Sequence, residues 1–281
     1  MNRKEKMTTI TTPDEFKQAA AADLAVLREK KPLVHNITNF VVMNYTAMAL
    51  LAVGASPIMA HAHEEVEDLT AISGALVLNI GTLTDYWIAS MIKAGKKANV
   101  RNIPVILDPV GAGATRMRTD AAKKIIREVD VSVIRGNASE ILSLADETSK
   151  TKGVDSLHSV DEASRVAGIL AAELKTVLAV TGKVDLITDG TSFIRVQNGH
   201  PMMSLVTGTG CTATAVIAAF SAVNPQPLYA AAEALAFFGL VGERAALEAG
   251  APGSYQVKLL DHLYLLDPES FKKGIQVTLN D

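Results

Sequence analysis

Short runs of β-branched and other apolar residues alternate along this chain with longer segments of helical pattern. Continuous apolar runs are what a parallel strand buried on both faces requires. The pattern predicts strands at Leu33–Val34, Ser56–Met59, Ala75–Ile80, Val105–Asp108, Val131–Arg135 and Val177–Thr181. It predicts crossover helices between them at Glu64–Ser73, Asp85–Asn99, Asp120–Val129 and Asp161–Leu174. We therefore expect an α/β fold with a doubly wound, mostly parallel central sheet and helices on both faces.

Both ends of the chain depart from this alternation. Thr12 and Pro13 are typical of a helix start, so the segment Asp14–Lys30 is predicted to be helical. After Asp185 the pattern changes to short strands separated by Asp189-Gly190 and Asn198-Gly199, which predict two-residue hairpins and an antiparallel edge. Three further helices are predicted at Cys211–Ala222, Leu228–Ala249 and Tyr255–Leu266. No linker or repeat divides the chain, so we expect a single domain over residues 1–281, with residues 1–11 as a flexible leader.

Composition and charge narrow the functional classes. Apolar residues make up 48% of the chain and charged residues 20%, which suits a buried sheet and favours some apolar surface between subunits. The formal net charge is −3, with Lys and Arg scattered among Asp and Glu. No basic stripe is present for a nucleic-acid backbone, so nucleic acid is excluded as a partner.

Cysteine use and hydropathy indicate the compartment. Cys211 is the only cysteine, which favours a reducing compartment. The first residues lack the apolar core of a signal peptide, and the longest apolar stretch, Phe40–Val53, is too short and too polar to span a bilayer. We therefore expect a cytoplasmic protein that does not associate with a membrane.

Polar and glycine-rich segments follow nearly every predicted strand. In open parallel sheets the ligand lies outside the carboxyl ends of the strands, so these segments are expected to share one edge of the sheet. They are His35–Asn39, Asn79–Thr82, Asp108–Gly113, Arg135–Asn137, Thr181–Gly182 and Thr207–Cys211.

The segment Thr207-Gly208-Thr209-Gly210-Cys211 carries the sharpest signal, because it precedes a helix of small residues. Glycines let the backbone approach a ligand closely, and free amides at the helix start would hold a transferring phosphoryl group. The structural alternative is a tight strand-to-helix turn without a ligand. For Cys211 three interpretations stay open: a weak base whose pKa is lowered by the helix dipole, a small buried apolar residue, and a covalent nucleophile.

Charged residues after two other strands complete the candidate chemistry. Asp108 would project over its strand end towards phosphate or metal, or else cap a turn. Arg135 is expected to pair with phosphate oxygens. Asn137 and Glu140 have the spacing of a helix capping box, and the functional alternative is that they hold water around Mg²⁺.

The remaining candidates are weaker. His61 and His63 point away from each other at their spacing, so a metal site there is not expected. The isolated histidines, namely His35, His158, His200 and His262, are interpreted as surface or satisfied loop residues. Asn39 and Met59 are expected to face the substrate, with ordinary core packing as the alternative for Met59.

Taken together, these residues resemble the ribokinase-like superfamily and, within it, the hydroxyethylthiazole kinase family of thiamine salvage. The similarity runs from about Pro32 to the last helix. It is densest at Leu33–Asn44 (LVHNITNFVVMN), Gly54–Ala60 (GASPIMA), Gly74–Thr82 (GALVLNIGT), Pro104–Thr115 (PVILDPVGAGAT) with Ile134–Glu140 (IRGNASE), and Thr207–Thr214 (TGTGCTAT).

The resemblance implies an ATP- and Mg²⁺-dependent kinase that phosphorylates the hydroxyl of hydroxyethylthiazole. It implies that Arg135, Thr181 and Asp108 contact ATP and that Glu140 and Asp108 serve Mg²⁺. It also implies that Met59, Gly208 and Asn39 bind the substrate and that Cys211 occupies the catalytic position. The family is further known for homotrimers whose active sites lie between subunits.

Three competing functions stay open. A pyrimidine or pyridoxal kinase of the same superfamily would have a different substrate loop around Asn39 and Met59. A dehydratase that repairs hydrated nicotinamide nucleotides would release free phosphate. A regulator that binds nucleotide without turnover would need an output module, for which the sequence has no signal.

Overall fold

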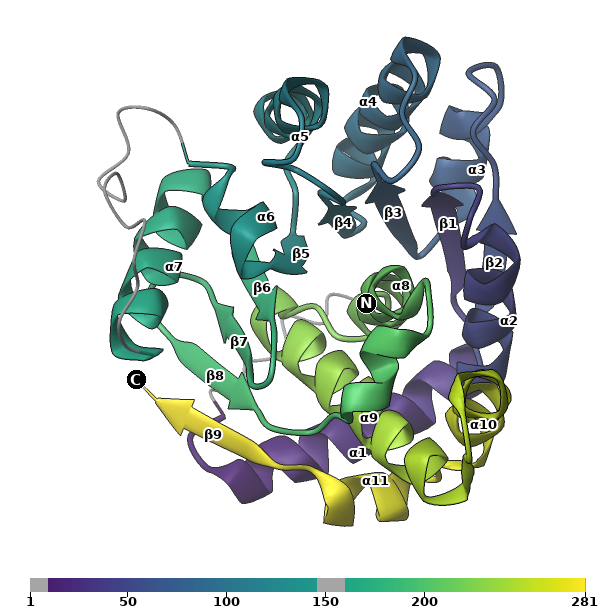
Figure 1. Ribbon diagram of the computed structural model, residues 1–281. Helices are drawn as coiled ribbons and strands as arrows, with labels where there is room; N and C mark the ends of the chain where they lie inside the picture. Colours follow the sequence, from purple (N-terminus) through teal and green to yellow (C-terminus); the bar gives the residue numbers. More distant parts are fainter. Residues whose placement is uncertain (1–9, 146–159, 281) are drawn as a thin grey trace, which may run out of the picture.

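The computed structural model describes residues 10–145 and 160–280, which build a nine-stranded sheet with helices on both faces (Figure 1). The sheet order is β2-β1-β3-β4-β5-β6-β7-β8-β9. Strands β1 to β6 pair in parallel, and β6 to β9 pair antiparallel. The strands are β1 (Leu33–Ile37), β2 (Ser56–Met59), β3 (Ala75–Asn79), β4 (Val105–Asp108), β5 (Val133–Asn137), β6 (Val177–Thr181), β7 (Asp185–Thr188), β8 (Phe193–Val196) and β9 (Val277–Asn280). The expected mostly parallel sheet with an antiparallel edge is confirmed.

The helices cover the two faces of the sheet in separate groups. Figure 1 shows α8 and α9 inside the curve of the sheet and α4 and α5 outside it. The helices are α1 (Pro13–Lys30), α2 (Met43–Val53), α3 (Val66–Ile72), α4 (Asp85–Arg101), α5 (Arg116–Glu128), α6 (Ala138–Leu142), α7 (Val160–Leu174), α8 (Thr209–Ser221), α9 (Pro227–Glu248), α10 (Pro252–Leu265) and α11 (Pro268–Gly274), with a 3₁₀ turn η1 (Pro201–Leu205).

Side chains of the parallel strands point alternately to the two faces of the sheet, so the apolar core consists of two clusters, one on each face. In β3, Ala75 and Val77 belong to the cluster under α8 and α9, whereas Leu76 and Leu78 belong to the cluster under α4 and α5. Successive side chains of a strand point to opposite faces, so both faces of the central strands are apolar and buried. This explains the continuous apolar runs in the sequence.

Local signals set the helix boundaries. Thr12 caps α1, and Glu15 completes the capping box by accepting the Thr12 amide at 3.1 Å. Thr84 and Thr115 accept backbone amides at the starts of α4 and α5. α5 therefore begins at Arg116, earlier than the predicted Asp120.

The first strand is longer than predicted because the sheet buries the polar residues His35 and Asn36 within it. β1 continues through His35 and Asn36 to Ile37. The His35 ring contacts Thr70 Oγ1 and the Ala60 carbonyl, each at 2.9 Å. His35 is therefore a buried strand residue, and its interpretation as a surface or loop residue is wrong.

The antiparallel edge differs from the prediction in two places. β7 and β8 pair Thr188 with Phe193, so residues 189–192 connect them and Asp189-Gly190 is not a two-residue hairpin. Asn198-Gly199 is not a hairpin at all, because β8 pairs with β9 from the end of the chain. The elements predicted from the sequence do not include β9, α2 or α11.

Two further expectations concern the leader and the membrane. Ile10 exchanges two 3.3 Å hydrogen bonds with the Tyr229 hydroxyl, so the end of the expected flexible leader is held against α9. Residues 1–9 lie outside the described residues. None of the helices in the described part of the chain has the length and apolar character needed to cross a membrane.

Asn198 joins α9 to the chain before β9. Its Nδ2 donates to Glu243 Oε1 at 3.1 Å and to the Gly274 carbonyl at 3.0 Å, and its Oδ1 accepts the Gln276 amide at 2.8 Å. Gly239 of α9 lies so close that a Cβ there would overlap the Asn198 carbonyl. The absence of a side chain at Gly239 thus allows this junction to form.

We expect Gly239→Ala to lower the free energy of unfolding by about 2 kcal/mol or more, because overpacking against a fixed backbone outweighs the gain in helix propensity. Urea unfolding measures the change. Gly253→Ala is the matched control, since a Cβ at Gly253 in α10 would meet nothing within 4 Å. Equal stability of the two variants would contradict the predicted clash.

Candidate active site

Polar side chains from the ends of the parallel strands meet the start of α8. Asn79 ends β3 and is the register partner of Asp108, which ends β4. Asn79 Nδ2 donates to Asp108 Oδ2 at 2.8 Å, and Thr214 Oγ1 of α8 donates to the same oxygen at 2.9 Å. All three side chains are buried. The strand edge and α8 are therefore joined through one carboxylate.

Asn79 extends this network to Asn39. Its Oδ1 accepts hydrogen bonds from Asn39 Nδ2 and from the Gly81 amide, both at 2.9 Å. A Cβ at Gly81 would lie 2.5 Å from Asn39 Nδ2, so only glycine permits this approach. Asn39 Nδ2 also lies 3.5 Å from Cys211 Sγ. The predicted residues Asn39, Asp108 and Cys211 are thus brought together.

The glycine turn before α8 has the expected form. Gly208 is the N-cap residue with φ of 87°, and a Cβ there would lie 2.8 Å from Val42 Cγ1. The helix begins at Thr209, so Cys211 is in its first turn. Amides of a first turn have no partner within their helix, and here they face the same edge as Asn39.

Cys211 does not have the lowered pKa that the helix start predicted. Burial, followed by the nearby Asp108 charge, raises the pKa of the Cys211 thiol to about 11. Hydrogen bonds from Asn79 and Asn39 and the charge of Arg135 act in the opposite direction and are smaller. The expectation of a lowered pKa is therefore wrong, because loss of solvation and a buried carboxylate outweigh the influence of the helix start. The thiol is protonated at neutral pH.

Asp108 is itself perturbed by its surroundings. Burial raises the pKa of the Asp108 carboxyl to about 6, although the Arg135 charge and the Thr214 hydrogen bond favour the ionised form. The charge of Glu140 adds to the increase. Two carboxylates therefore repel each other beside one guanidinium.

Arg135 supplies the positive charge of the site. Its Nη2 donates to Thr181 Oγ1 at 2.8 Å, which joins the middle of β5 to the end of β6. Its Nε is buried and has no hydrogen-bond partner among the described residues. A Cβ at Gly210 would lie 2.6 Å from Arg135 Nη1, so the guanidinium lies against the glycine turn. This side chain is placed to accept an anion at the start of α8.

Glu140 has the structural role that its spacing predicted. Its Oε2 accepts the Asn137 amide, and Asn137 Oδ1 accepts the Glu140 amide, both at 2.9 Å. Its Oε1 accepts the Gly111 amide at 2.9 Å, which fixes the loop after β4. The capping box at the start of α6 is confirmed, and the carboxylate also lies next to Asp108.

The structure also places the remaining candidate residues, Met59 and the histidines. Met59 ends β2 and packs, partly buried, against the core under α8 and α9. His61 and His63 form no metal cluster, and no group of three potential ligands occurs anywhere in residues 10–145 and 160–280. His200 and His262 are partly buried loop and helix residues, and His158 lies outside the described residues.

Three residues of the site were not assigned a role from the sequence. Asn79 and Thr214 complete the Asp108 network, and of these two only Asn79 belonged to a polar segment that was expected at this edge of the sheet. Asp185 begins β7, and burial raises the pKa of its carboxyl to about 6 although the Arg135 charge favours ionisation. The sequence contains no local signal for Asp185, because its partner Arg135 lies on another strand.

Comparison with known proteins gives a consistent result. Residues 24–269 match the model of the Hydroxyethylthiazole kinase family. A protein from Desulfotalea psychrophila named hydroxyethylthiazole kinase is 59% identical over 258 residues, which cover 92% of this chain and 94% of that protein. The solved hydroxyethylthiazole kinase structure from Pyrococcus horikoshii has a TM-score of 0.87 at 44% identity and covers 94% of this chain and 100% of that chain.

A more distant structure supports the fold alone. Pyridoxal kinase from Staphylococcus aureus, solved with AMP-PCP and pyridoxal, has a TM-score of 0.62 at 16% identity. It covers 89% of this chain and 98% of that chain. The ribokinase-like fold expected from the sequence is confirmed.

The raised pKa of Asp108 predicts a pH-dependent stability difference. The pKa of this carboxyl is about 6 in the folded state, compared with an ordinary value of 3.8. Between these two pH values the folded state binds the proton more tightly than the unfolded state does. The contribution of Asp108 to the free energy of unfolding therefore falls as the pH rises from about 4 to about 6. In Asp108→Asn, the amide oxygen can take the place of Oδ2 and still accept from Asn79 and Thr214. As the pH rises from 4 to 7, we expect the free energy of unfolding of Asp108→Asn to increase by about 3 kcal/mol relative to that of wild type.

Thermal unfolding without nucleotide at a series of pH values measures this difference. Asp120→Asn on α5 is the control, because its carboxylate is 64% exposed and forms only a surface ion pair with Arg116. A constant difference between Asp108→Asn and wild type at all pH values would contradict the prediction.

Proposed function

Because the chain belongs to the hydroxyethylthiazole kinase family, we propose that it transfers the γ-phosphoryl group of ATP to hydroxyethylthiazole at the Cys211 end of the strand edge. The acceptor is the hydroxyl of 4-methyl-5-(2-hydroxyethyl)thiazole, and the product is its monophosphate, in thiamine salvage. The observation that carries the proposed location is the Nε of Arg135, which is buried beside the start of α8 and has no hydrogen-bond partner in the part of the chain that the structure describes.

Arg135 and the start of α8 would stabilise the transferring group. In phosphoryl transfer the negative charge spreads over the equatorial oxygens of a loose transition state. The guanidinium of Arg135 and the free amides from Gly208 to Cys211 present positive charge to such oxygens. Thr181 holds the guanidinium in place through its 2.8 Å hydrogen bond, and in our proposal it also contacts ATP.

Cys211 would position the acceptor hydroxyl instead of removing its proton early. With a pKa of about 11 the thiol stays protonated at neutral pH, so it is a poor general base. A loose transition state develops little positive charge on the attacking oxygen and needs little base strength. Asn39, at 3.5 Å from Sγ, keeps the thiol oriented. Met59 and Gly208 are proposed to line the pocket for the substrate ring.

Asp108 and Glu140 fit a Mg²⁺ ion. Their mutual repulsion, seen in the raised pKa of Asp108, is what a divalent cation would relieve, and carboxylate oxygens are the ligands that Mg²⁺ takes. Both Glu140 oxygens already accept backbone amides, which favours contact through metal-bound water. When bound, Mg²⁺ would neutralise charge on the phosphates of ATP.

The assembly and the compartment are further parts of the proposal. We propose a homotrimer with active sites between subunits, working in the cytoplasm as one kinase domain. Large apolar side chains are exposed on α2 and α10, which pack against each other, and a subunit contact would cover them. They are Met48, Leu51, Val257, Tyr264 and Leu265.

A substrate panel tests the activity. With ATP and Mg²⁺ we expect hydroxyethylthiazole to be phosphorylated with one ADP formed per product, and hydroxymethylpyrimidine, pyridoxal and hydrated NADH to react far more slowly. ADP and the phosphorylated product are both followed. Activity on pyridoxal instead would identify the competing vitamin kinase, release of free phosphate would identify the dehydratase, and nucleotide binding without turnover would identify the regulator.

Replacement of Cys211 tests its proposed role. We expect Cys211→Asp to keep or raise kcat, because an ionised carboxylate is a better base than a protonated thiol, and Cys211→Ala to leave a reduced but measurable rate, within about 100-fold of wild type. Steady-state kinetics with saturating ATP and thiazole provide the measurement. An inactive Asp variant that folds and binds ATP would refute this role.

A further inference from the structure

Three aromatic rings from separate segments meet beside the candidate active site. Phe40 follows β1, His61 follows β2, and Trp87 lies in the first turn of α4. The centroid of Trp87 is 5.1 Å from that of Phe40 and 4.4 Å from that of His61, and Phe40 meets His61 edge-on at 6.5 Å. These separations are typical of interacting aromatic pairs. The three rings are called the aromatic stack below.

The loop after β1 connects this stack to the reacting groups. Asn39, directly before Phe40, donates towards Cys211 Sγ at 3.5 Å, and its Oδ1 accepts the Val41 amide at 3.1 Å. Val42, at the other end of the loop, lies against Gly208. Phe40 is thus held between two contacts to the glycine turn of α8.

The rings of the aromatic stack differ in their exposure to solvent. Trp87 is only 5% exposed and belongs to the core under α4 and α5. Phe40 is 63% exposed, so its ring contributes little to the core while one face remains available. An exposed aromatic ring fixed on a buried one can contact a bound planar molecule with little loss of conformational freedom.

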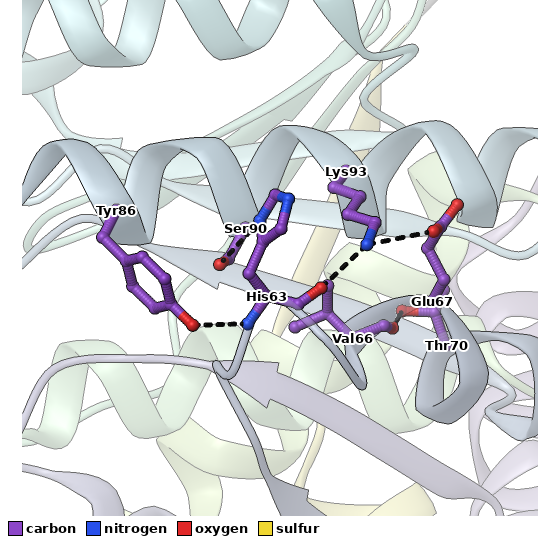
Figure 2. A network of polar contacts seen from close by, with 7 residues as sticks. All are labelled: His63, Val66, Glu67, Thr70, Tyr86, Ser90 and Lys93. Atoms are coloured by element: carbon purple, nitrogen blue, oxygen red, sulfur yellow. Dashed lines mark hydrogen bonds and ion pairs between the residues drawn. The ribbon is translucent and has the colours of Figure 1, made fainter.

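Hydrogen bonds before and after His61 in the sequence fix the loop that carries its ring. Before it, His35 fixes the Ala60 carbonyl at 2.9 Å. After it, Figure 2 shows His63 anchored to α4: its amide donates to Tyr86 Oη and its carbonyl accepts from Lys93 Nζ, both at 2.8 Å. Lys93 also pairs with Glu67 at 3.3 Å. The loop that carries His61 is therefore positioned before any ligand binds.

From these contacts we propose that Phe40 is a specificity-determining residue, whose ring, supported by His61 and Trp87, stacks on the aromatic ring of the substrate. The inference rests on the proposed function and adds to it the group that recognises the ring. Stacking selects planar aromatic alcohols and brings their hydroxyl to Cys211, whose thiol is oriented by Asn39, the neighbour of Phe40. Because Phe40 contacts only the unreactive ring, it contributes to binding and leaves the chemical step unchanged.

Kinetics of the full-length protein test this assignment. We expect Phe40→Ala to raise the KM for hydroxyethylthiazole about tenfold, equivalent to about 1.4 kcal/mol, with kcat and the KM for ATP within about twofold of wild type. Phe40→Tyr, which keeps the aromatic face, should stay within about twofold of wild type. Val100→Ala on α4, a 77% exposed apolar residue outside the site, is the matched control.

Binding without turnover gives an independent measurement, because Trp87 is the only tryptophan in the chain. We expect hydroxyethylthiazole to change the Trp87 emission saturably without ATP, with a Kd about tenfold higher in Phe40→Ala than in wild type or Val100→Ala. Light scattering confirms that the variants keep the same oligomeric state.

The possible failures are distinguishable. Wild-type activity on the thiazole with an unchanged KM and Kd in Phe40→Ala would overturn the stacking role and leave the proposed function intact. A change in oligomeric state without a change in Kd would also overturn it, in favour of a subunit contact. Wild type and Val100→Ala both inactive on the thiazole would overturn the proposed function and the inference together.

Discussion

The alignment of the parallel strand ends is the constraint on which the site depends. The register pairs Asn79 with Asp108 at the ends of β3 and β4, and Asn137 with Thr181 at the ends of β5 and β6. Side chains that are far apart in the sequence therefore lie along one edge. α8 then crosses this edge and is joined to it by the hydrogen bond from Thr214 to Asp108.

The buried Asp108 carboxylate determines the electrostatics around it. Its charge attracts the Arg135 guanidinium, which lies beside the glycine turn, and it also raises the pKa of the Cys211 thiol. A site with a protonated thiol and a preorganised cation suits chemistry that depends on positioning and charge stabilisation more than on a strong base. The burial that weakens Cys211 as a base is thus compatible with phosphoryl transfer.

Rigid elements support both ends of the site. Asn39 is held by Asn79 from the sheet, while the His61 loop is held by Tyr86 and Lys93 from α4. Fixed side chains bind a ligand with a smaller loss of conformational entropy than mobile ones. The same helix, α4, therefore contributes to the core through Trp87 and to the proposed substrate contact through the aromatic stack.

The pattern of amino acids was sufficient to predict the parallel sheet, the strand edge on which the candidate site lies and several of the residues that meet there. Apolar runs, the Thr12 capping signal and polar residues after strands are local patterns, and local physics sets them. Four features could be seen only in the folded chain, namely the raised pKa of Cys211, the pairing of β9 with β8, the role of Asn198 and the packing of Phe40 against Trp87. These features depend on burial and on contacts between distant segments, which have no counterpart in the local sequence pattern.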